Sequence, residues 1–413
     1  MSLPTPAERG RPALRRTISL PWLVLYGLGT TVGAGIYALT GVVAGRAGMY
    51  APSAFLLASL IALPSALSFA ELSSRFPRAG GEAVYVREGT GWSWRATAVG
   101  LLVVAAGLVS AATVSIAFVG YLADLISLPR LPVLGLVVLG VGGVAAWGVR
   151  ESVALAGVMT LVEVVGLILV IGMGWGHLVD LPERAAELLP ADLPAWQLVS
   201  TAAILCFYAF LGFEDMVNVA EEVKDPRTVL PRGIILTLLL TALLYALVAS
   251  VAVLAVPPAE LATSESPLAL VFERCGGTAA WLGLIALFAL LNGALIQIMK
   301  AARVLYGLAS EESLPQPLAR VHPRTRTPLL ATGLATATTL LLALAFPLAQ
   351  LAATTAVITL TTFTLANLSL VLVKLRAPNP PEARIFPLWV PGLGFVVSFG
   401  FVGLELTRWA GSR

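Results

Sequence analysis

Charged residues are scarce in this sequence. Lysine, arginine, aspartate and glutamate make up 12% of the 413 residues, whereas a typical soluble domain carries about 25%. Apolar residue types make up 58%, and the mean hydropathy is +0.90. Because a water-soluble fold could not bury so much apolar surface, the composition excludes an ordinary soluble domain and predicts a protein whose solvent is the lipid bilayer.

Histidine, cysteine and nucleotide-binding motifs are also few or absent. His177 and His322 fall in loops predicted on opposite sides of the membrane, so we expect no shared metal site, and Cys206 and Cys275 are not expected to form a disulfide. The sequence has no G-x-x-x-x-G-K-[ST] phosphate loop, which argues against ATP-driven transport. The net charge of +3 comes from basic residues spread over several loops, which does not favour a nucleic-acid partner. We expect no metal and no cofactor.

Apolar stretches long enough to cross a bilayer, about 20 residues each, recur along the chain. They predict an all-α integral membrane protein of about eleven helices, at 21–44, 51–74, 95–126, 131–149, 153–176, 196–221, 232–256, 278–306, 328–346, 350–375 and 386–408. The basic segment 1–20 precedes a long span that another span follows at once. We therefore expect it to be a cytoplasmic N-terminal segment and no cleaved signal peptide.

The basic residues indicate an orientation. If the N-terminus is cytoplasmic, 20 of the 26 lysines and arginines fall in loops on the cytoplasmic side, as positively charged loops prefer. This bias predicts a cytoplasmic N-terminus and an extracytoplasmic C-terminus. The composition, rich in alanine, leucine and arginine but poor in lysine, favours the inner membrane of a bacterial cell.

Two spans contain features that an uninterrupted helix would avoid. The first span contains the glycine-rich run 27–36, and the sixth contains Gly212 followed closely by Glu214 and Asp215. In lipid, an opened backbone survives only where it lines a protein cavity or holds a ligand, so both breaks predict a binding site. Close helix packing is the alternative for the first span, because Gly29-x-x-x-Gly33 also fits a contact between helices.

The positions of the two breaks predict an inverted repeat. They lie five helices apart, so the first span and the sixth cross the membrane in opposite directions. Residues 21–176 would form repeat one with helices 1–5, and residues 196–375 would form repeat two with helices 6–10. The last helix, 386–408, lies outside this five-plus-five arrangement.

The two breaks suit the two ends of an amino acid. At the first break, Gly33, Ala34, Gly35 and Ile36 would expose backbone N–H groups at a helix start, which attracts a carboxylate. At the second break, freed carbonyls of Tyr208, Ala209 and Leu211 could accept hydrogen bonds from an ammonium group.

Several segments resemble the amino acid–polyamine–organocation superfamily of transporters. GTTVGAGIYALTG (29–41) is similar to its broken first helix, and AELSSRFPRAGGEAVYVREGTG (70–91) to its cytoplasmic loop between helices two and three. FYAFLGFEDMVNVAEEVKDPRTVLPR (207–232) resembles its broken sixth helix and the loop that follows, and RVLYGLASEESLP (303–315) the end of its eighth. The resemblance covers nearly the whole chain up to the tenth span. It implies a LeuT-like inverted repeat, alternating access and an amino acid held between helices one and six.

Glu163, near the middle of the fifth span, is the strongest single-residue candidate. A carboxylate at this depth is costly and usually functional. In proton-coupled relatives with a similar GVRES run, the matching position resembles one that a lysine usually occupies, so the sign of the charge is reversed here. We hypothesise that Glu163 takes up a coupling proton or cation, since burial favours the protonated form of a carboxylate. The alternative is a permanently protonated acid that is hydrogen-bonded to backbone.

Glu214 begins the inner half of the broken sixth helix, where the helix dipole favours an acid. Capping is one interpretation, with Asp215 in support. The resemblance implies another, because arginine/agmatine exchangers carry an acid at the matching position beside the substrate gate. Phe210 and Tyr208 flank the break, where their rings could simply pack in lipid or gate the cavity, and the resemblance favours gating. Further candidates for its polar lining are Ser110, Thr113, Ser115, Asn292 and Gln297.

The function expected is secondary active transport of amino acids, including cationic ones or related amines, most simply by proton symport. Exchange of amino acids or amines is an alternative within the same class. A membrane enzyme would need a convergent acid–base or nucleophile cluster, which the scattered buried acids do not provide. A non-transporting sensor with a transporter fold is the alternative from another class. The sequence does not predict an oligomeric state.

Overall fold

The computed structural model describes residues 16–78, 80–126, 128–179, 181–264, 266–378, 380 and 383–411, and this part of the chain is almost entirely helical. The helices are α1 (Leu20–Thr31), α2 (Gly33–Ala47), α3 (Ala51–Arg75), α4 (Gly81–Thr90), α5 (Ser93–Leu125), α6 (Arg130–Trp147), α7 (Val149–Met173), α8 (Trp175–Val179), α9 (Leu181–Leu188), α10 (Leu193–Tyr208), α11 (Pro226–Ala255), α12 (Pro258–Thr263), α13 (Pro267–Arg274), α14 (Ala279–Ser310), α15 (Leu329–Ala345), α16 (Leu348–Arg376) and α17 (Trp389–Gly411). Three segments are 3₁₀ helices: η1 (Gly48–Tyr50), η2 (Phe213–Glu222) and η3 (Gln316–Ala319).

Nine helices of the described part are long and apolar enough to cross a membrane, so the predicted number of eleven spans is not confirmed. The first predicted span is divided at Val32 into α1 and α2, which have 12 and 15 residues. The ninth is α15, which is apolar but has 17 residues. The loop predicted between the second and third spans contains the helix α4.

The outward-facing surfaces of several long helices are apolar. Leu136 on α6 is 74% exposed, Leu193 at the start of α10 is 72% exposed and Val396 on α17 is 64% exposed. In water such surfaces would be costly, whereas lipid tails accept them. The interior, in contrast, contains charged side chains such as Arg303, which is fully buried.

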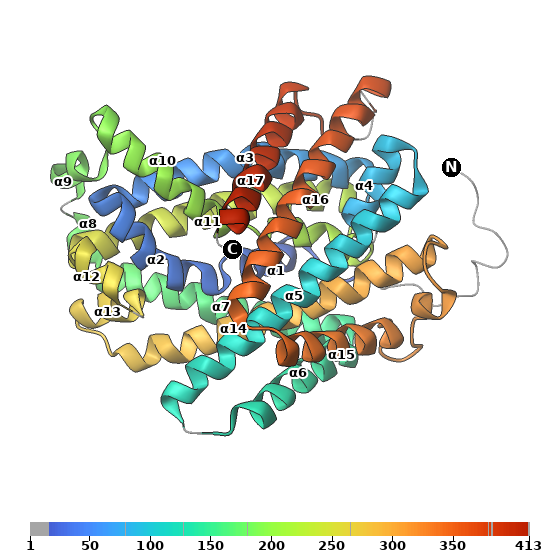
Figure 1. The fold of residues 1–413 in the computed structure, drawn as a ribbon, viewed down its shortest axis with the longest axis horizontal. Coiled ribbons are helices and arrows are strands. Elements are labelled where there is room, and N and C mark those ends of the chain that lie inside the picture. Colours follow the sequence, from blue (N-terminus) through green and yellow to red (C-terminus); the bar gives the residue numbers. More distant parts are fainter. Residues whose placement is uncertain are drawn as a thin grey trace.

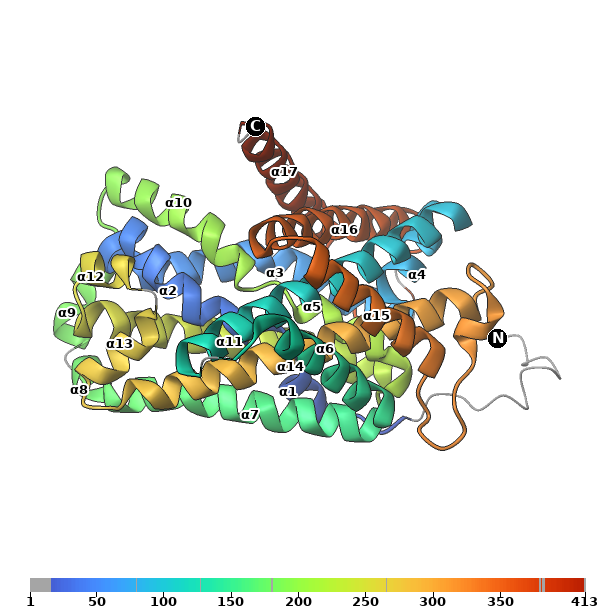
Figure 2. The same ribbon diagram turned by 60° about the horizontal axis from the view of Figure 1, so that its bottom comes forward.

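Corresponding helices of the two predicted repeats pack against each other. α3 packs extensively against α11, and α5 packs against α14 and α16 (Figure 1). α1 contacts α11, α7 and η2, which brings the first and sixth predicted spans together at the centre. The helix α17 packs on α16 and α3 and extends away from the other helices (Figure 2).

Candidate functional site

The first break lies between α1 and α2. α1 ends at Thr31, α2 begins at Gly33, and Gly33 has a φ of +26°, which a residue with a side chain rarely adopts. The first four N–H groups of a helix have no partner within it, and in α2 these belong to the predicted residues Gly33, Ala34, Gly35 and Ile36. No side chain caps the start of α2. The helix break lies where the glycine run predicted it, and the binding of a carboxylate by the N–H groups at the start of α2 stays a prediction.

The second break is longer. α10 ends at Tyr208, residues 209–212 form turns, and η2 follows. Gly212 has a φ of +131°, and a Cβ at this position would overlap the carbonyl oxygen of Thr30. Only glycine allows the two breaks to approach so closely. The Glu214 carboxylate accepts a hydrogen bond of 2.7 Å from the Gly212 backbone N–H, which is the capping role that its position suggested.

A single hydroxyl group joins the two breaks. Tyr245 of α11 is fully buried, and its Oη lies 2.9 Å from the Thr31 carbonyl oxygen and 3.0 Å from the Ala209 carbonyl oxygen. The carbonyl oxygen of Val32 is 3.3 Å away. Sequence reasoning missed this residue, because a tyrosine within an apolar helix resembles an ordinary core residue.

A cavity of about 350 Å³ lies against both breaks. It is lined by Thr30, Gly35, Leu39, Ser110, Thr113, Tyr208, Leu211, Gly212, Glu214, Gln297, Lys300, Thr355, Ala356 and Thr359. These residues come from α1, α2, α5, α10, the second break, α14 and α16. The walls carry hydroxyl groups, one carboxylate and one ammonium group, so the cavity suits a small polar molecule with charges of both signs.

The structure brings only some of the predicted site residues to this cavity. Gly35, Tyr208, Leu211 and Glu214 line it, as do the predicted polar residues Ser110, Thr113 and Gln297. Phe210 is fully buried behind the wall, where its ring lies 5.2 Å from that of Tyr245.

Other predicted residues lie away from the cavity wall. Ile36 is fully buried, and the Ala209 carbonyl accepts the Tyr245 hydroxyl instead of facing the cavity unpaired. Ser115 hydrogen-bonds the Ala111 carbonyl of its own helix, and Asn292 belongs to a different polar cluster. Gly33 is not among the lining residues that the structure describes, and the side chain of Ala34 lies outside the described part.

Charged residues of α14 neutralise those of η2. The Lys300 ammonium lies 2.6 Å from Asp215 Oδ1, and Gln297 Nε2 donates to Asp215 Oδ2 at 2.7 Å. One turn of α14 further on, Arg303 Nε donates to Glu222 Oε1 at 2.9 Å, and both of these side chains are fully buried. Asp215 thus pairs with a lysine, whereas the sequence predicted only support for a helix cap. A buried carboxylate needs such a partner.

The end of η2 is also joined to the segment before α1. The backbone N–H groups of Thr17 and Ile18 donate to the Glu222 carbonyl at 2.8 and 3.0 Å, and the Lys224 N–H donates to the Ile18 carbonyl at 2.8 Å. With the Arg303–Glu222 ion pair, this contact closes the bundle beneath the second break.

A second polar cluster surrounds Glu163 on α7. Glu163 is fully buried, and Asn292 Nδ2 of α14 donates to Glu163 Oε1 at 2.8 Å and to Thr160 Oγ1 at 2.9 Å. Thr160 and Asn292 lie directly against Gly29 of α1. Within the described residues, Glu163 Oε2 and Asn292 Oδ1 have no hydrogen-bond partner. The cluster therefore presents two unsatisfied buried acceptors next to the first broken helix.

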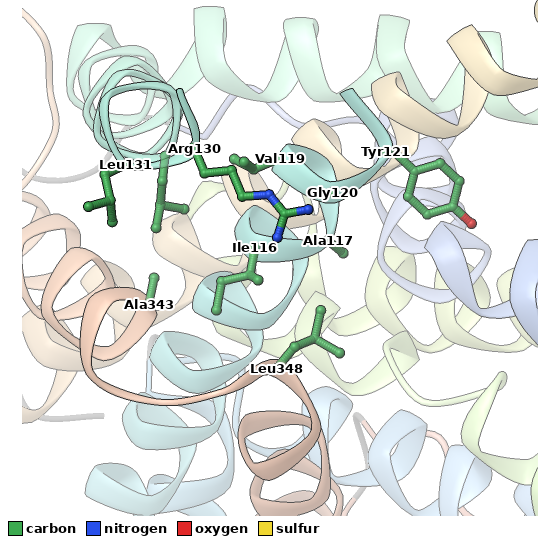
Figure 3. A pocket seen from close by; sticks show the side chains of 10 residues that line it. Ile116, Ala117, Val119, Gly120, Tyr121, Arg130, Leu131, Ala343 and Leu348 are labelled. Carbon is green, nitrogen blue, oxygen red and sulfur yellow. The ribbon is translucent and has the colours of Figure 1, made fainter. Parts of the chain in front are cut away.

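A larger cavity, of about 520 Å³, lies elsewhere, between α5, α6 and the adjoining ends of α15 and α16 (Figure 3). Its lining includes Ile116, Leu131, Leu134 and Leu348, and Arg130 is the charged residue among the described side chains that line it. No residue of either break lines this cavity. The described part of its wall is mostly apolar and belongs to neither break. We therefore do not assign the substrate to this cavity on size alone.

Fold and site together define a membrane transporter with two broken helices crossing at a central cavity. A sequence model of the amino acid permease family matches residues 18–404. The chain therefore belongs to the amino acid permease family, within the superfamily that its motifs resemble, and it is a multi-pass secondary transporter of amino acids.

Individual relatives agree with this assignment. The chain is 28% identical to the branched-chain amino acid permease BcaP of Bacillus subtilis over 418 residues, with 94% of this chain and 88% of BcaP covered. It is 31% identical over 397 residues to the mitochondrial cationic amino acid transporter 3 of Arabidopsis thaliana, with 90% of this chain covered, and it spans 64% of that protein's length.

A solved structure shows the same fold. MhsT in complex with L-phenylalanine aligns with a TM-score of 0.61 and 17% sequence identity, covering 95% of this chain and 99% of MhsT. The LeuT-like fold class predicted from the sequence is thus confirmed.

Proposed function

We propose that this permease is a proton-coupled amino acid symporter that works by alternating access, with the substrate bound in the cavity between the two breaks. The single observation that supports coupling is the Glu163 cluster. A fully buried carboxylate with one oxygen that has no hydrogen-bond partner among the described residues is costly when charged, so protonation would stabilise it. Its neighbours Thr160 and Asn292 touch the first broken helix, which gives a protonation event a route to the substrate site.

The substrate is positioned by both breaks. The N–H groups at the start of α2 would receive the carboxylate, and the wall formed by Tyr208, Leu211 and Glu214 would face the ammonium group or the side chain. Glu214 is the acid that a cationic side chain would meet. In the membrane we place the N-terminus on the cytoplasmic side of the cell inner membrane, as the distribution of basic residues favours.

Uptake into proteoliposomes tests the proposal. The panel contains radiolabelled leucine, phenylalanine, arginine and putrescine, each measured with and without an imposed inward proton gradient. Wild-type protein is expected to accumulate at least one amino acid above equilibrium only with the gradient, and Glu163→Gln is expected to lose this response. Glu151→Gln, an exposed acid at the start of the same helix, is the matched control and should respond like wild type.

Three results would overturn parts of the proposal. A gradient response that survives Glu163→Gln would remove Glu163 from coupling. Flux that occurs only against preloaded substrate would make the protein an exchanger, and the absence of flux for every compound would favour a sensor.

A further inference from the structure

The helix α17 lies outside the inverted repeat but reaches the wall of the substrate cavity. Tyr208 is the last residue of α10 and lines the cavity. Its hydroxyl donates a hydrogen bond of 2.7 Å to Glu405 Oε1 of α17. One residue before it, Phe207 stacks on Phe401 of the same helix, with ring centroids 4.7 Å apart and an angle of 15° between the planes.

Glu405 is an unusual residue for this helix. Between Trp389 and Thr407 the remaining side chains are apolar or small, apart from Ser398 and Thr407, whose hydroxyls bond carbonyls of their own helix. A carboxylate in such a membrane helix has a high free-energy cost unless a hydrogen-bond donor contacts it. Glu405 meets such a donor in the Tyr208 hydroxyl at the end of α10.

The two contacts have different physical consequences. The stacked rings of Phe207 and Phe401 pack α17 against α10, and Phe207 is buried and is not among the described residues that line the cavity. The hydrogen bond instead acts on a ring that forms part of the cavity wall. A hydrogen bond to a charged group is directional and strong, about 1.5–3 kcal/mol net, so it restricts the position of the Tyr208 ring.

We propose that Glu405 is a positioning residue, which through its hydrogen bond holds the Tyr208 ring on the wall of the substrate cavity, so that α17 contributes to substrate affinity. This inference rests on the proposed function in one respect, namely that the cavity binds the amino acid. Glu405 itself does not line the cavity.

Transport kinetics test the proposal with four variants. Glu405→Ala is expected to raise the KM of the transported amino acid about tenfold, the factor that about 1.4 kcal/mol represents, while the maximal rate changes less than threefold. Tyr208→Phe should have a similar effect, because it removes the donor and keeps the ring. Glu405→Gln keeps an acceptor oxygen and should stay within threefold of wild type. The double variant Tyr208→Phe/Glu405→Ala should be no worse than either single variant.

Two controls separate positioning from general packing of α17. Thr407→Val changes an exposed residue on the same helix and should leave KM unchanged. Phe401→Leu weakens the ring stacking without touching the hydrogen bond, and should change KM less than threefold. A KM for Glu405→Ala within twofold of wild type, or multiplication of the two single effects in the double variant, would refute the proposal.

A second readout needs no substrate. Ala356 lines the same cavity from α16, and a cysteine there can be labelled by a charged methanethiosulfonate reagent in a background with Cys206→Ala and Cys275→Ser. Glu405→Ala and Tyr208→Phe should each raise the labelling rate of Ala356→Cys at least threefold, whereas Thr407→Val should not. An unchanged rate would overturn the positioning role. Altered labelling in a protein that transports no amino acid would instead refute the proposed function and leave the positioning role intact.

Discussion

The two helix breaks differ in the charge of the residues that form them. The first is interrupted around a single residue, Val32, and the residues from Thr31 to Ile36 carry no charge. The second contains a four-residue turn and then η2, whose ten residues include four acids. Three of those acids lie on the buried side of η2, and two of them pair with Lys300 and Arg303 of α14.

This difference shows how each break is stabilised. The open ends of the first break are backbone groups, which a tyrosine hydroxyl or a bound carboxylate can satisfy. The second break is held in place by charges that come from another helix. We therefore expect substitutions of charged residues to destabilise the second break more than the first. Substitution of the glycine in each break should also affect the two breaks to different extents.

Removal of Lys300 should have the largest effect. Lys300→Met leaves the buried Asp215 carboxylate with Gln297 as its remaining hydrogen-bond donor among the described side chains. Loss of one partner of a buried ion pair costs about 3–5 kcal/mol. We expect a marked fall in folded yield and in the midpoint of thermal unfolding, measured by fluorescence-detected size-exclusion chromatography of the detergent-solubilised protein.

A double variant makes this prediction specific. Asp215→Asn/Lys300→Met removes both charges and should recover most of the lost stability, whereas Lys224→Met, at an exposed lysine, should cause no loss. If Lys300→Met is as stable as wild type, the charged pair does not hold the second break.

The group of buried charged residues around the second break includes Glu82 of α4, and the stability of the protein should depend on pH because of this residue. Glu82 is fully buried, burial raises its pKa to about 7, and Asp215 adds to this while Lys300 opposes it. Because this pKa lies above the ordinary value of 4.5, the folded state binds more protons than the unfolded state between the two values. Stability should therefore fall as pH rises from about 4.5 to about 7, by about 3 kcal/mol at 1.36 kcal/mol per unit.

Thermal unfolding between pH 5 and pH 8 checks this expectation. Glu82→Gln should flatten the pH dependence relative to wild type, and Glu88→Gln, an exposed residue on the same helix, should not. Parallel curves for wild type and Glu82→Gln would show that Glu82 does not contribute.

Each break contains one glycine with a positive φ, Gly33 or Gly212, and these two provide a matched pair of variants. A methyl group at Gly212 would overlap the Thr30 carbonyl, whereas nothing lies within 4 Å of a methyl group at Gly33. Gly212→Ala combines strain with overpacking, at a total of about 2–3 kcal/mol, and it displaces a residue of the cavity wall. Gly33→Ala adds only the cost of its φ, about 1 kcal/mol. We expect initial uptake to fall at least tenfold in Gly212→Ala and about twofold in Gly33→Ala. Equal losses would contradict this difference between the breaks.

The sequence predicted the existence and position of both breaks, because each depends on local signals. A glycine run at 27–36 and a glycine followed by two acids at 212–215 are unfavourable within a lipid-exposed helix wherever the rest of the chain lies. Gly35, Tyr208, Leu211 and Glu214, which the sequence places at the breaks, line the cavity between them, and their role in binding stays a prediction.

The partners of these residues could not be predicted, because they depend on tertiary packing. Asp215 and Lys300 are 85 positions apart, and Tyr208 and Glu405 are 197 positions apart. Nothing local distinguishes Lys300 from a lysine at a helix end, or Glu405 from an acid at the membrane surface. The predicted count of eleven spans is not confirmed for a local reason, since a hydropathy pattern does not show that the first span divides into two short helices.

Tyr245 provides the last test, because its hydroxyl belongs to both breaks. Tyr245→Phe keeps the ring, which packs 5.5 Å from Phe55 and 5.2 Å from Phe210, and removes only the donor to the Thr31 and Ala209 carbonyls. One neutral hydrogen bond contributes about 1 kcal/mol net, so we expect a small loss of thermal stability. The effect on transport should be clearer, at about three- to fivefold in initial uptake, because the variant frees one carbonyl at each break and lets the two move independently. Thr241→Val, at a buried hydroxyl one turn earlier on α11, is the control and should leave uptake near the wild-type rate. If Tyr245→Phe transports like wild type, the breaks are coupled through the close approach of Gly212 to Thr30 alone, and the contrast between Gly212→Ala and Gly33→Ala becomes the deciding measurement.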